Sequence, residues 1–184
     1  MLDTDKAELL KLARTTLETH LADGKIPPHQ TSSEALLAQK GAFVSLHQGD
    51  ELRGCIGILV ADRELFKVVQ HCVLSAALED TRFISVTRDE VDSLSIEISV
   101  LTPFRRIKDI NEIEVGKHGL YIVRGEYRGL LLPQVATQYR WDRLKFLEHT
   151  CLKSSLPESA WSDPQTVIYT FEAEVFSDAS VPNP

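Results

Sequence analysis

The sequence predicts an α+β fold, a single compact domain of mostly antiparallel sheet with hairpins and flanking helices. Two hairpin signals, at Gly49-Asp50 and Gly125-Glu126, each lie between segments that are typical of strands. Helical patterns alternate with the strands, but the strands connect largely by hairpins rather than by regular β-α-β crossovers. A length of 184 residues, with 43% hydrophobic and 26% charged residues, fits one globular domain.

The first element is an amphipathic helix. Apolar residues recur every four positions from Leu9 onward and predict a helix over residues 5–22 that ends near Gly24. Pro27-Pro28 then forms a loop, because proline lacks the backbone donor that a helix needs. A short helix is expected after Ser32 or Ser33.

The first hairpin is predicted over residues 42–60, with a two-residue turn at Gly49-Asp50. Glycine at the first central position suits a type II′ turn, whose twist matches that of paired strands. The pairs that a two-residue turn predicts are Gln48 with Glu51, Leu46 with Arg53, and Val44 with Cys55.

The remaining elements follow from the two periods of hydrophobic residues. Helical spacing predicts helices over residues 62–78 and 142–153. Alternation predicts a strand at 94–100, a second hairpin at 119–133 and a last strand at 167–176. No linker is long enough to separate independent domains, so we expect one domain over residues 1–184.

Charge and targeting signals restrict the partners. Twenty Lys and Arg residues against 27 Asp and Glu residues give a net charge of −7, which argues against nucleic acid and anionic lipid as partners. The basic residues at 105–108 are interpreted as a solvated turn. The longest apolar run is too short to cross a bilayer, and no secretory signal is visible, so we expect a cytoplasmic protein without a membrane partner.

Cysteine and glycine patterns argue against several cofactors. Cys55, Cys72 and Cys151 are odd in number and widely spaced, which favours reduced thiols over a disulfide framework. No paired-cysteine or paired-histidine spacing predicts a metal site. Residues 53–57 have neither the dinucleotide nor the P-loop glycine spacing, so no cofactor is expected.

Six motifs spread along the chain carry a family resemblance. They are Gly41-Ala42-Phe43-Val44-Ser45-Leu46, Leu52-Arg53-Gly54-Cys55-Ile56-Gly57, Asp80-Thr81-Arg82-Phe83, Ile98-Ser99-Val100-Leu101-Thr102, Gly116-Lys117-His118-Gly119-Leu120 and Leu132-Pro133-Gln134-Val135-Ala136. In sequence and order they resemble the AMMECR domain family, also called AmmeMemoRadiSam system protein A in prokaryotes. The resemblance covers roughly residues 5–177.

This resemblance implies a fold and partners rather than an activity. It implies an α+β fold of two unequal lobes, with the signature Leu52–Gly57 near a cleft between them. It also implies association, through gene context, with a Memo-like protein that resembles extradiol dioxygenases and with a radical S-adenosylmethionine protein. An uncharacterised AMMECR-type protein is therefore expected.

Two residues of the signature suggest catalysis. Arg53 and Cys55 are two positions apart, so on a regular strand both side chains point to one face. A guanidinium beside a thiol lowers the pKa of that thiol, which makes Cys55 a candidate nucleophile with Arg53 as anion anchor. His118 precedes a predicted strand and is a candidate general base. Alternatively, Cys55 is a small buried side chain, Gly54 and Gly57 permit a bulge or close packing, and His118 bonds only to a turn.

Other polar residues are candidates for ligand binding. Arg53 can bind a carboxylate or phosphate, or it can pair with Glu97 or Asp80 of the protein itself. Asp80 and Arg82 follow a helix and can form a pair at its end. Gln134 either lines the cleft or caps the next segment.

Three functional hypotheses remain open. The leading one is a non-redox binding or accessory module, in which the cleft at Leu52–Gly57 holds a small anionic ligand or a partner peptide. The second is a cysteine-dependent enzyme that acts on a small carbonyl or acyl metabolite through Cys55. The third is a regulatory protein-interaction domain that uses the hairpin at Arg124–Arg128.

Overall fold

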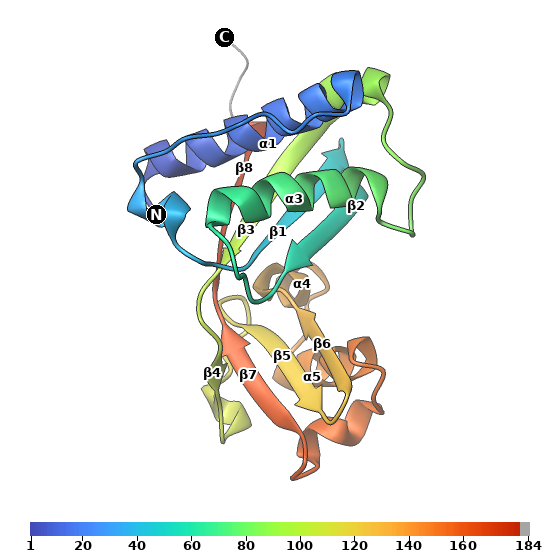
Figure 1. The fold of residues 1–184 in the computed structure, drawn as a ribbon. Coiled ribbons are helices and arrows are strands. Elements are labelled where there is room, and N and C mark those ends of the chain that lie inside the picture. Colours follow the sequence, from blue (N-terminus) through green and yellow to red (C-terminus); the bar gives the residue numbers. More distant parts are fainter. Residues whose placement is uncertain (181–184) are drawn as a thin grey trace. The chain divides into compact units, whose positions relative to one another are not determined.

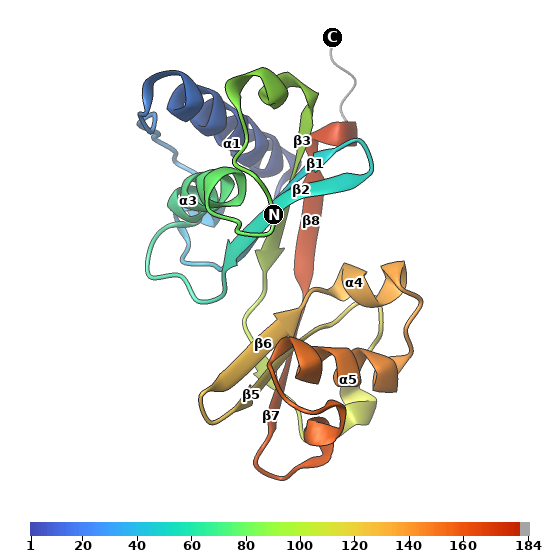
Figure 2. The same cartoon turned by 90° about the vertical axis from the view of Figure 1, so that its right-hand side faces the viewer.

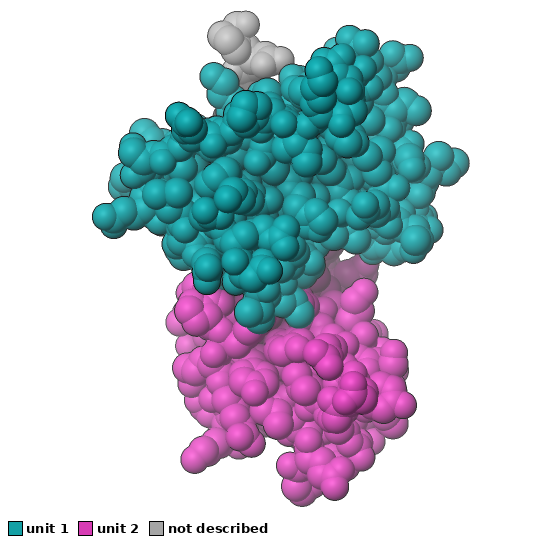
Figure 3. All heavy atoms as spheres, viewed as in Figure 1, with its two compact units in different colours: residues 1–101, 174–184 teal, residues 102–173 magenta. Residues whose placement is uncertain are grey.

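Two four-stranded sheets, each with its own helices, make up the fold (Figure 1). The computed structural model describes residues 1–180 and divides into two compact units of unequal length (Figure 3). Unit 1 comprises Met1–Leu101 and the chain from Glu174 onward, and unit 2 comprises Thr102–Ala173. The predicted α+β class with antiparallel hairpins is confirmed.

Unit 1 contains sheet 1, in the strand order β2-β1-β3-β8. Its elements are α1 (Asp3–Asp23), α2 (Glu34–Leu37), β1 (Ala42–Gln48), β2 (Glu51–Ile58), α3 (Leu65–Leu78), η1 (Arg88–Ser93), β3 (Leu94–Leu101), β8 (Ala173–Ser177) and η4 (Asp178–Ser180). The helix predicted from residue 62 begins at Leu65, because Glu64 rather than Asp62 is its N-cap.

One face of sheet 1 forms the larger hydrophobic core. Helices α1 and α3 lie on the same side of the sheet (Figures 1 and 2). Alternate residues of β1 and β3, such as Val44 and Ile98, are fully buried against Leu17 of α1 and Val69 of α3. The opposite face of sheet 1 therefore carries the intervening residues, which are mostly polar.

The register of the first hairpin departs from the prediction. Gln48 pairs with Glu51 as expected, but Leu46 pairs with Gly54 and Ser45 with Cys55, since a bulge between Leu46 and His47 leaves Arg53 as an extra residue in β2. Such a bulge reverses the facing of every later side chain on the strand. The predicted pairs of Leu46 with Arg53 and of Val44 with Cys55 are therefore wrong.

Unit 2 contains sheet 2, in the strand order β4-β7-β5-β6. Its elements are β4 (Arg105–Arg106), η2 (Ile110–Glu112), β5 (Gly119–Arg124), β6 (Tyr127–Leu131), α4 (Pro133–Gln138), α5 (Arg143–Lys153), η3 (Glu158–Ser162) and β7 (Val167–Phe171). The predicted second hairpin is confirmed, with Arg124 opposite Tyr127. Phe146 of α5 and Ile122 of β5 are fully buried in the core of this unit.

The last predicted strand is in fact two strands in two sheets. It breaks at Glu172, between β7 of sheet 2 and β8 of sheet 1. Glu172 pairs instead with Thr102, whose backbone N–H donates to the Glu172 carbonyl at 2.9 Å and whose Oγ1 accepts from the Glu172 N–H at 2.8 Å. The alternation of side chains continues through Glu172, so the sequence pattern gave no signal of the break.

Gly54 is required by the packing of α3 on β2. A Cβ atom at this position would lie closer to the Ala76 carbonyl oxygen than van der Waals contact permits. We expect Gly54→Ala to destabilise the protein by about 2–3 kcal/mol, because the helix must move off the strand. Urea unfolding is the measurement. The control is Gly49→Ala in the same hairpin, where nothing crowds the new Cβ and only the positive φ costs about 1 kcal/mol; an equal loss in both variants would contradict the packing argument.

Candidate functional site

The backbone of Cys55 is held at the open edge of sheet 1. β2 is an edge strand, and its residue Cys55 directs its N–H away from β1, where it donates to Asp80 Oδ2 at 2.9 Å. The Cys55 carbonyl accepts from an Arg82 terminal nitrogen at 3.3 Å. Asp80 and Arg82 thus take the place that a neighbouring strand would occupy, and they protect this edge from pairing with another chain.

Asp80 and Arg82 also bind each other in a two-point pair. Arg82 Nε donates to Asp80 Oδ1 at 2.9 Å, and an Arg82 terminal nitrogen donates to Oδ2 at 2.7 Å. The Asp80 side chain is buried, and its bonds to Arg82 lower its pKa to about 2. The predicted pair exists, but it closes the edge of β2 instead of serving as a cap on the end of α3.

The Cys55 side chain lies on the face of sheet 1 opposite α1 and α3. It belongs to a row of residues across three strands, because Ser45 opposes Cys55 on one side and Glu97 on the other. Ser45 Oγ donates to Cys55 Sγ at 3.2 Å. Burial is the main cause that raises the pKa of the Cys55 thiol, and the charges of Asp80 and Glu97 add to that effect. Cys55 is therefore a protonated thiol at neutral pH.

Arg53 points to different partners from those the sequence suggested. Its Nε donates to Glu90 Oε1 at 3.0 Å, a terminal nitrogen donates to Oε2 at 3.3 Å, and another donates to the Ile84 carbonyl at 2.5 Å. Glu90, not Glu97 or Asp80, is thus its carboxylate partner. The bulge also removes Arg53 from the face of Cys55, and the cation that lowers the pKa of the thiol is Arg82. Arg53 therefore fastens the loop after α3 to β2.

The two glycines of the signature permit close packing on opposite faces. Gly54 faces the backbone of α3, as described above, whereas Gly57 lies under the aromatic ring of Phe43. Phe43 and Gly57 are opposite each other in the β1–β2 ladder. Both glycines therefore have a packing role, as in the structural interpretation of the signature.

Two other predicted residues lie in unit 2, so neither unit by itself brings them together with Cys55. His118 is 7% exposed, and its Nδ1 accepts from the Glu114 backbone N–H at 3.0 Å. Its Nε2 is 4.0 Å from a Glu172 carboxylate oxygen. His118 thus bonds to the turn that precedes β5, as the structural alternative proposed. Gln134 lies in the first turn of α4 and makes a polar interaction.

His47 is a residue of this face that the sequence analysis missed. Because Ser45 and His47 are two positions apart on β1, both project from the same face of sheet 1. The Nε2 atom of His47 is buried and has no hydrogen-bond partner within the described residues. Alternation along β1 was the available signal, but it needed the correct register to connect His47 with Cys55.

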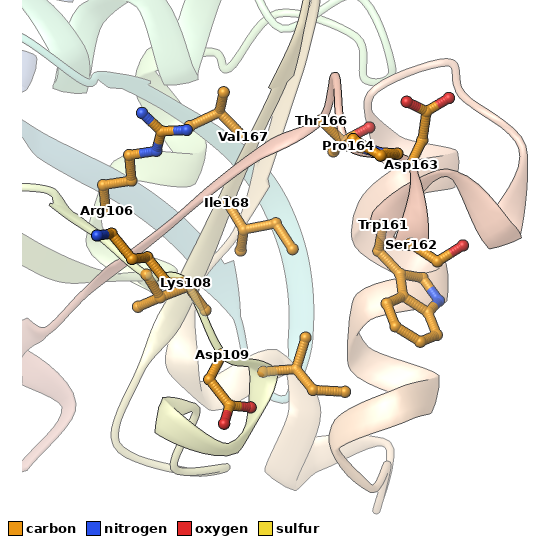
Figure 4. A pocket seen from close by; sticks show the side chains of 12 residues that line it. Arg106, Lys108, Asp109, Trp161, Ser162, Asp163, Pro164, Thr166, Val167 and Ile168 are labelled. Carbon is orange, nitrogen blue, oxygen red and sulfur yellow. The ribbon is translucent and has the colours of Figure 1, made fainter.

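Four cavities of the described residues, with volumes of 450 to 910 Å³, are lined by residues other than those of the signature Leu52–Gly57. Figure 4 shows one of 590 Å³ in unit 2, with Arg106 and Lys108 on one wall and Trp161 and Asp163 on the other.

Across residues 1–180, no cluster of three or more His, Cys, Asp or Glu side chains could hold a metal ion. No described helix is both long and apolar enough to span a membrane.

The Asp80–Arg82 pair predicts a pH dependence of stability. The folded pKa of Asp80 lies below its usual value, so the pair contributes fully above about pH 4 and is lost as the pH falls toward 2. We expect Asp80→Asn to lower the free energy of unfolding by about 1–2 kcal/mol at pH 7 and by much less at pH 2, given that Arg82 is half exposed. Urea unfolding across this range measures it. Asp50→Asn, in the exposed turn, is the control, and a loss that does not change with pH would refute the assignment.

The environment of Cys55 predicts slow alkylation. Iodoacetamide should label Cys55 of the native protein with a midpoint above the usual thiol pKa of about 8.5. Glu97→Gln should lower this midpoint and Arg82→Ala should raise it further, whereas Arg53→Ala should leave it unchanged. Mass spectrometry of the labelled peptide gives the rates. Rapid labelling at neutral pH that Arg53→Ala slows would instead support the nucleophile hypothesis.

Comparisons with known proteins find relatives that match this chain over most of the length of both proteins. Protein MK0488 of Methanopyrus kandleri is 39% identical over 186 residues, which cover 96% of this chain and 89% of the relative. Protein MJ0810 of Methanocaldococcus jannaschii is 40% identical over 177 residues, with 92% and 88% covered. The crystal structure of the uncharacterized protein PH0010 from Pyrococcus horikoshii superposes with a TM-score of 0.88 at 38% identity, over 92% of this chain and 89% of that one.

The family model named AMMECR1 matches residues 10–176, a span that includes the signature strand, the Asp80–Arg82 pair, all of sheet 2 and all of sheet 1 except the last residue of β8. The recognition made from the six motifs is confirmed. This chain belongs to the AMMECR1 family.

Proposed function

We propose that this protein is a non-redox binding module, and that the outer face of sheet 1 at Cys55 takes a cationic side chain of a partner peptide. The observation that carries this proposal is Glu97. Its side chain is half-buried on this face, and its carboxylate has no hydrogen-bond or ion-pair partner in residues 1–180. A partly buried carboxylate gains most from a partner that brings a positive charge.

The neighbours of Glu97 suit the same ligand. The Ser45 hydroxyl donates a hydrogen bond to Cys55 Sγ, and the lone pairs of its oxygen can still accept a hydrogen bond. The Cys55 thiol is neutral, and Asp80 neutralises the positive charge of Arg82 in their ion pair. The face at the row Cys55-Ser45-Glu97 is thus slightly negative and offers acceptors, which favours an ammonium or guanidinium group.

A small anion is the less favoured of the two ligands that the sequence suggested. Arg53, the expected anion anchor, is already engaged by Glu90 and two loop carbonyls. The enzyme hypothesis is weakened for a related reason, because a protonated thiol without a cation on its own face is a poor nucleophile. A binding or accessory role needs neither a free Arg53 nor a thiolate.

The partners that the family resemblance implies are the first to test. We propose that a segment of a Memo-like protein or of a radical S-adenosylmethionine protein is the bound peptide. A cytoplasmic location suits the three free cysteines of this chain. An accessory role of this kind requires a surface segment with an exposed Lys or Arg on the partner. The hairpin at Arg124–Arg128 remains an alternative contact surface for a regulatory role.

The test is binding of this protein to overlapping peptides that cover both partner sequences. We expect the bound peptides to contain Lys or Arg, and Glu97→Gln to weaken binding roughly tenfold, the size expected when one charge-assisted hydrogen bond is lost. Glu51→Gln, at an exposed acidic residue of β2 in the same sheet, is the matched control and should bind like the wild type. Fluorescence anisotropy with the labelled peptides gives the dissociation constants.

Three results would overturn the proposal. One is that no peptide of either partner binds. A second is binding that persists when Lys and Arg of the peptide are replaced by Gln. The third is an equal effect of Glu97→Gln and Glu51→Gln, which would mean that only general charge is sensed.

A further inference from the structure

The outer face of sheet 2 in unit 2 is aromatic. Helix α5 packs its apolar side on one face of this sheet, and no helix of unit 2 covers the other face (Figures 1 and 2). That uncovered face carries Phe104, Tyr121 and Tyr169, whose ring centroids are 5.1 to 6.5 Å apart. Phe171 lies over Gly119, and its ring meets that of Phe104 edge to face at a centroid distance of 5.3 Å. The strands thus present a continuous aromatic platform.

The strand register places two arginines on the same face. Arg106 of β4 opposes Tyr169, and Arg128 of β6 opposes Val123, so each cation lies beside the aromatic platform and on opposite edges of the sheet. Both are exposed, and neither has a salt bridge among the described residues. The strand residues of this face are Arg106, Gly119, Tyr121, Val123, Arg128, Leu130, Val167, Tyr169 and Phe171, and none of them is acidic.

The charge of the whole chain hides this local pattern. Unit 2 contains ten Lys and Arg residues against nine Asp and Glu residues, so the excess of acidic residues lies in the rest of the chain. The net charge of −7 therefore argues against non-specific electrostatic attraction to nucleic acid, but it does not describe this face. A ligand held here needs stacking as well as charge.

We infer that the aromatic face of sheet 2 binds a planar base that carries a phosphate, the chemistry of a nucleotide. Tyr121 and Tyr169 are half-buried, so each ring has accessible surface on which a base can stack. Arg106 and Arg128 are placed to bind phosphate, since a guanidinium without a carboxylate partner has all its donors available. A peptide without acidic side chains would use the rings equally well, but it would leave both arginines without a counter-charge.

Two sources can supply this chemistry, a free mononucleotide and a single-stranded nucleic acid. Aromatic side chains on an exposed antiparallel sheet stack successive bases of a single strand, and the flanking arginines follow its backbone. The rings spread from Phe104, which directly precedes β4, across Tyr169 of β7 to Tyr121 of β5, and this spread favours more than one base. A single strand should therefore bind more tightly than a mononucleotide.

The experiment is fluorescence anisotropy of the full chain with a labelled oligouridylate, and in parallel with a labelled uridine monophosphate. We expect the oligonucleotide to bind, and raising the salt from 50 to 200 mM to weaken it roughly sevenfold if two phosphates are neutralised. Tyr121→Leu and Tyr169→Leu should each weaken binding by about fivefold or more, whereas Tyr121→Phe keeps the ring and should bind normally. Arg106→Gln and Arg128→Gln should each reduce the salt dependence.

Matched controls separate this face from the rest of the surface. Tyr127→Leu removes an exposed tyrosine that opposes Arg124 and so belongs to the other face, and Arg88→Gln removes an exposed arginine of unit 1. Both should bind like the wild type, and thermal unfolding checks that every variant folds. Binding of the mononucleotide alone would support the site with a free nucleotide as its ligand. Failure of both ligands to bind, or equal losses in the control variants, would overturn the inference.

Discussion

The extra residue at Arg53 is the constraint on which the arrangement of sheet 1 depends. By adding one position to β2, the bulge turns Gly54 toward α3 and Cys55 toward the opposite face. The helix can then approach the strand backbone at Ala76, and the larger core closes. Arg53 itself leaves the ladder and binds Glu90 and the loop after α3. One local irregularity thus fixes the strand, the helix and the loop relative to one another.

The residues of the signature Leu52–Gly57 have structural roles that together shape the outer face of sheet 1. Gly54 and Gly57 admit close neighbours, Arg53 anchors a loop, and the backbone of Cys55 is closed by Asp80 and Arg82. Each of these residues has its partners within unit 1. Among the described residues, the Glu97 carboxylate and the Nε2 atom of His47 remain unpartnered on the outer face, and Glu97 lies beside a hydroxyl and a neutral thiol. The signature therefore resembles a scaffold for recognition more than a catalytic set.

The two sheets differ in the side chains that their outer faces carry. Sheet 1 offers a carboxylate and small polar groups, whereas sheet 2 offers stacked aromatic rings and two arginines without acidic neighbours. These differences follow from side-chain alternation, because in each sheet one set of alternate residues fills the core and the other set lies on the outer face. A family whose members share this fold can combine both faces in one chain.

The sequence by itself determined the fold class, the family and most elements, because hydrophobic period, turn residues and motif order are local properties. Both hairpin turns and α5 with its Asp142 cap follow from such signals. Only the tertiary structure decided the partner of Arg53, the face of Cys55 and the division of the last strand at Glu172. A single bulge changes the face of the sheet to which every later side chain of the strand points. The carboxylate that an arginine contacts and the sheet that a strand joins depend on residues distant in the sequence.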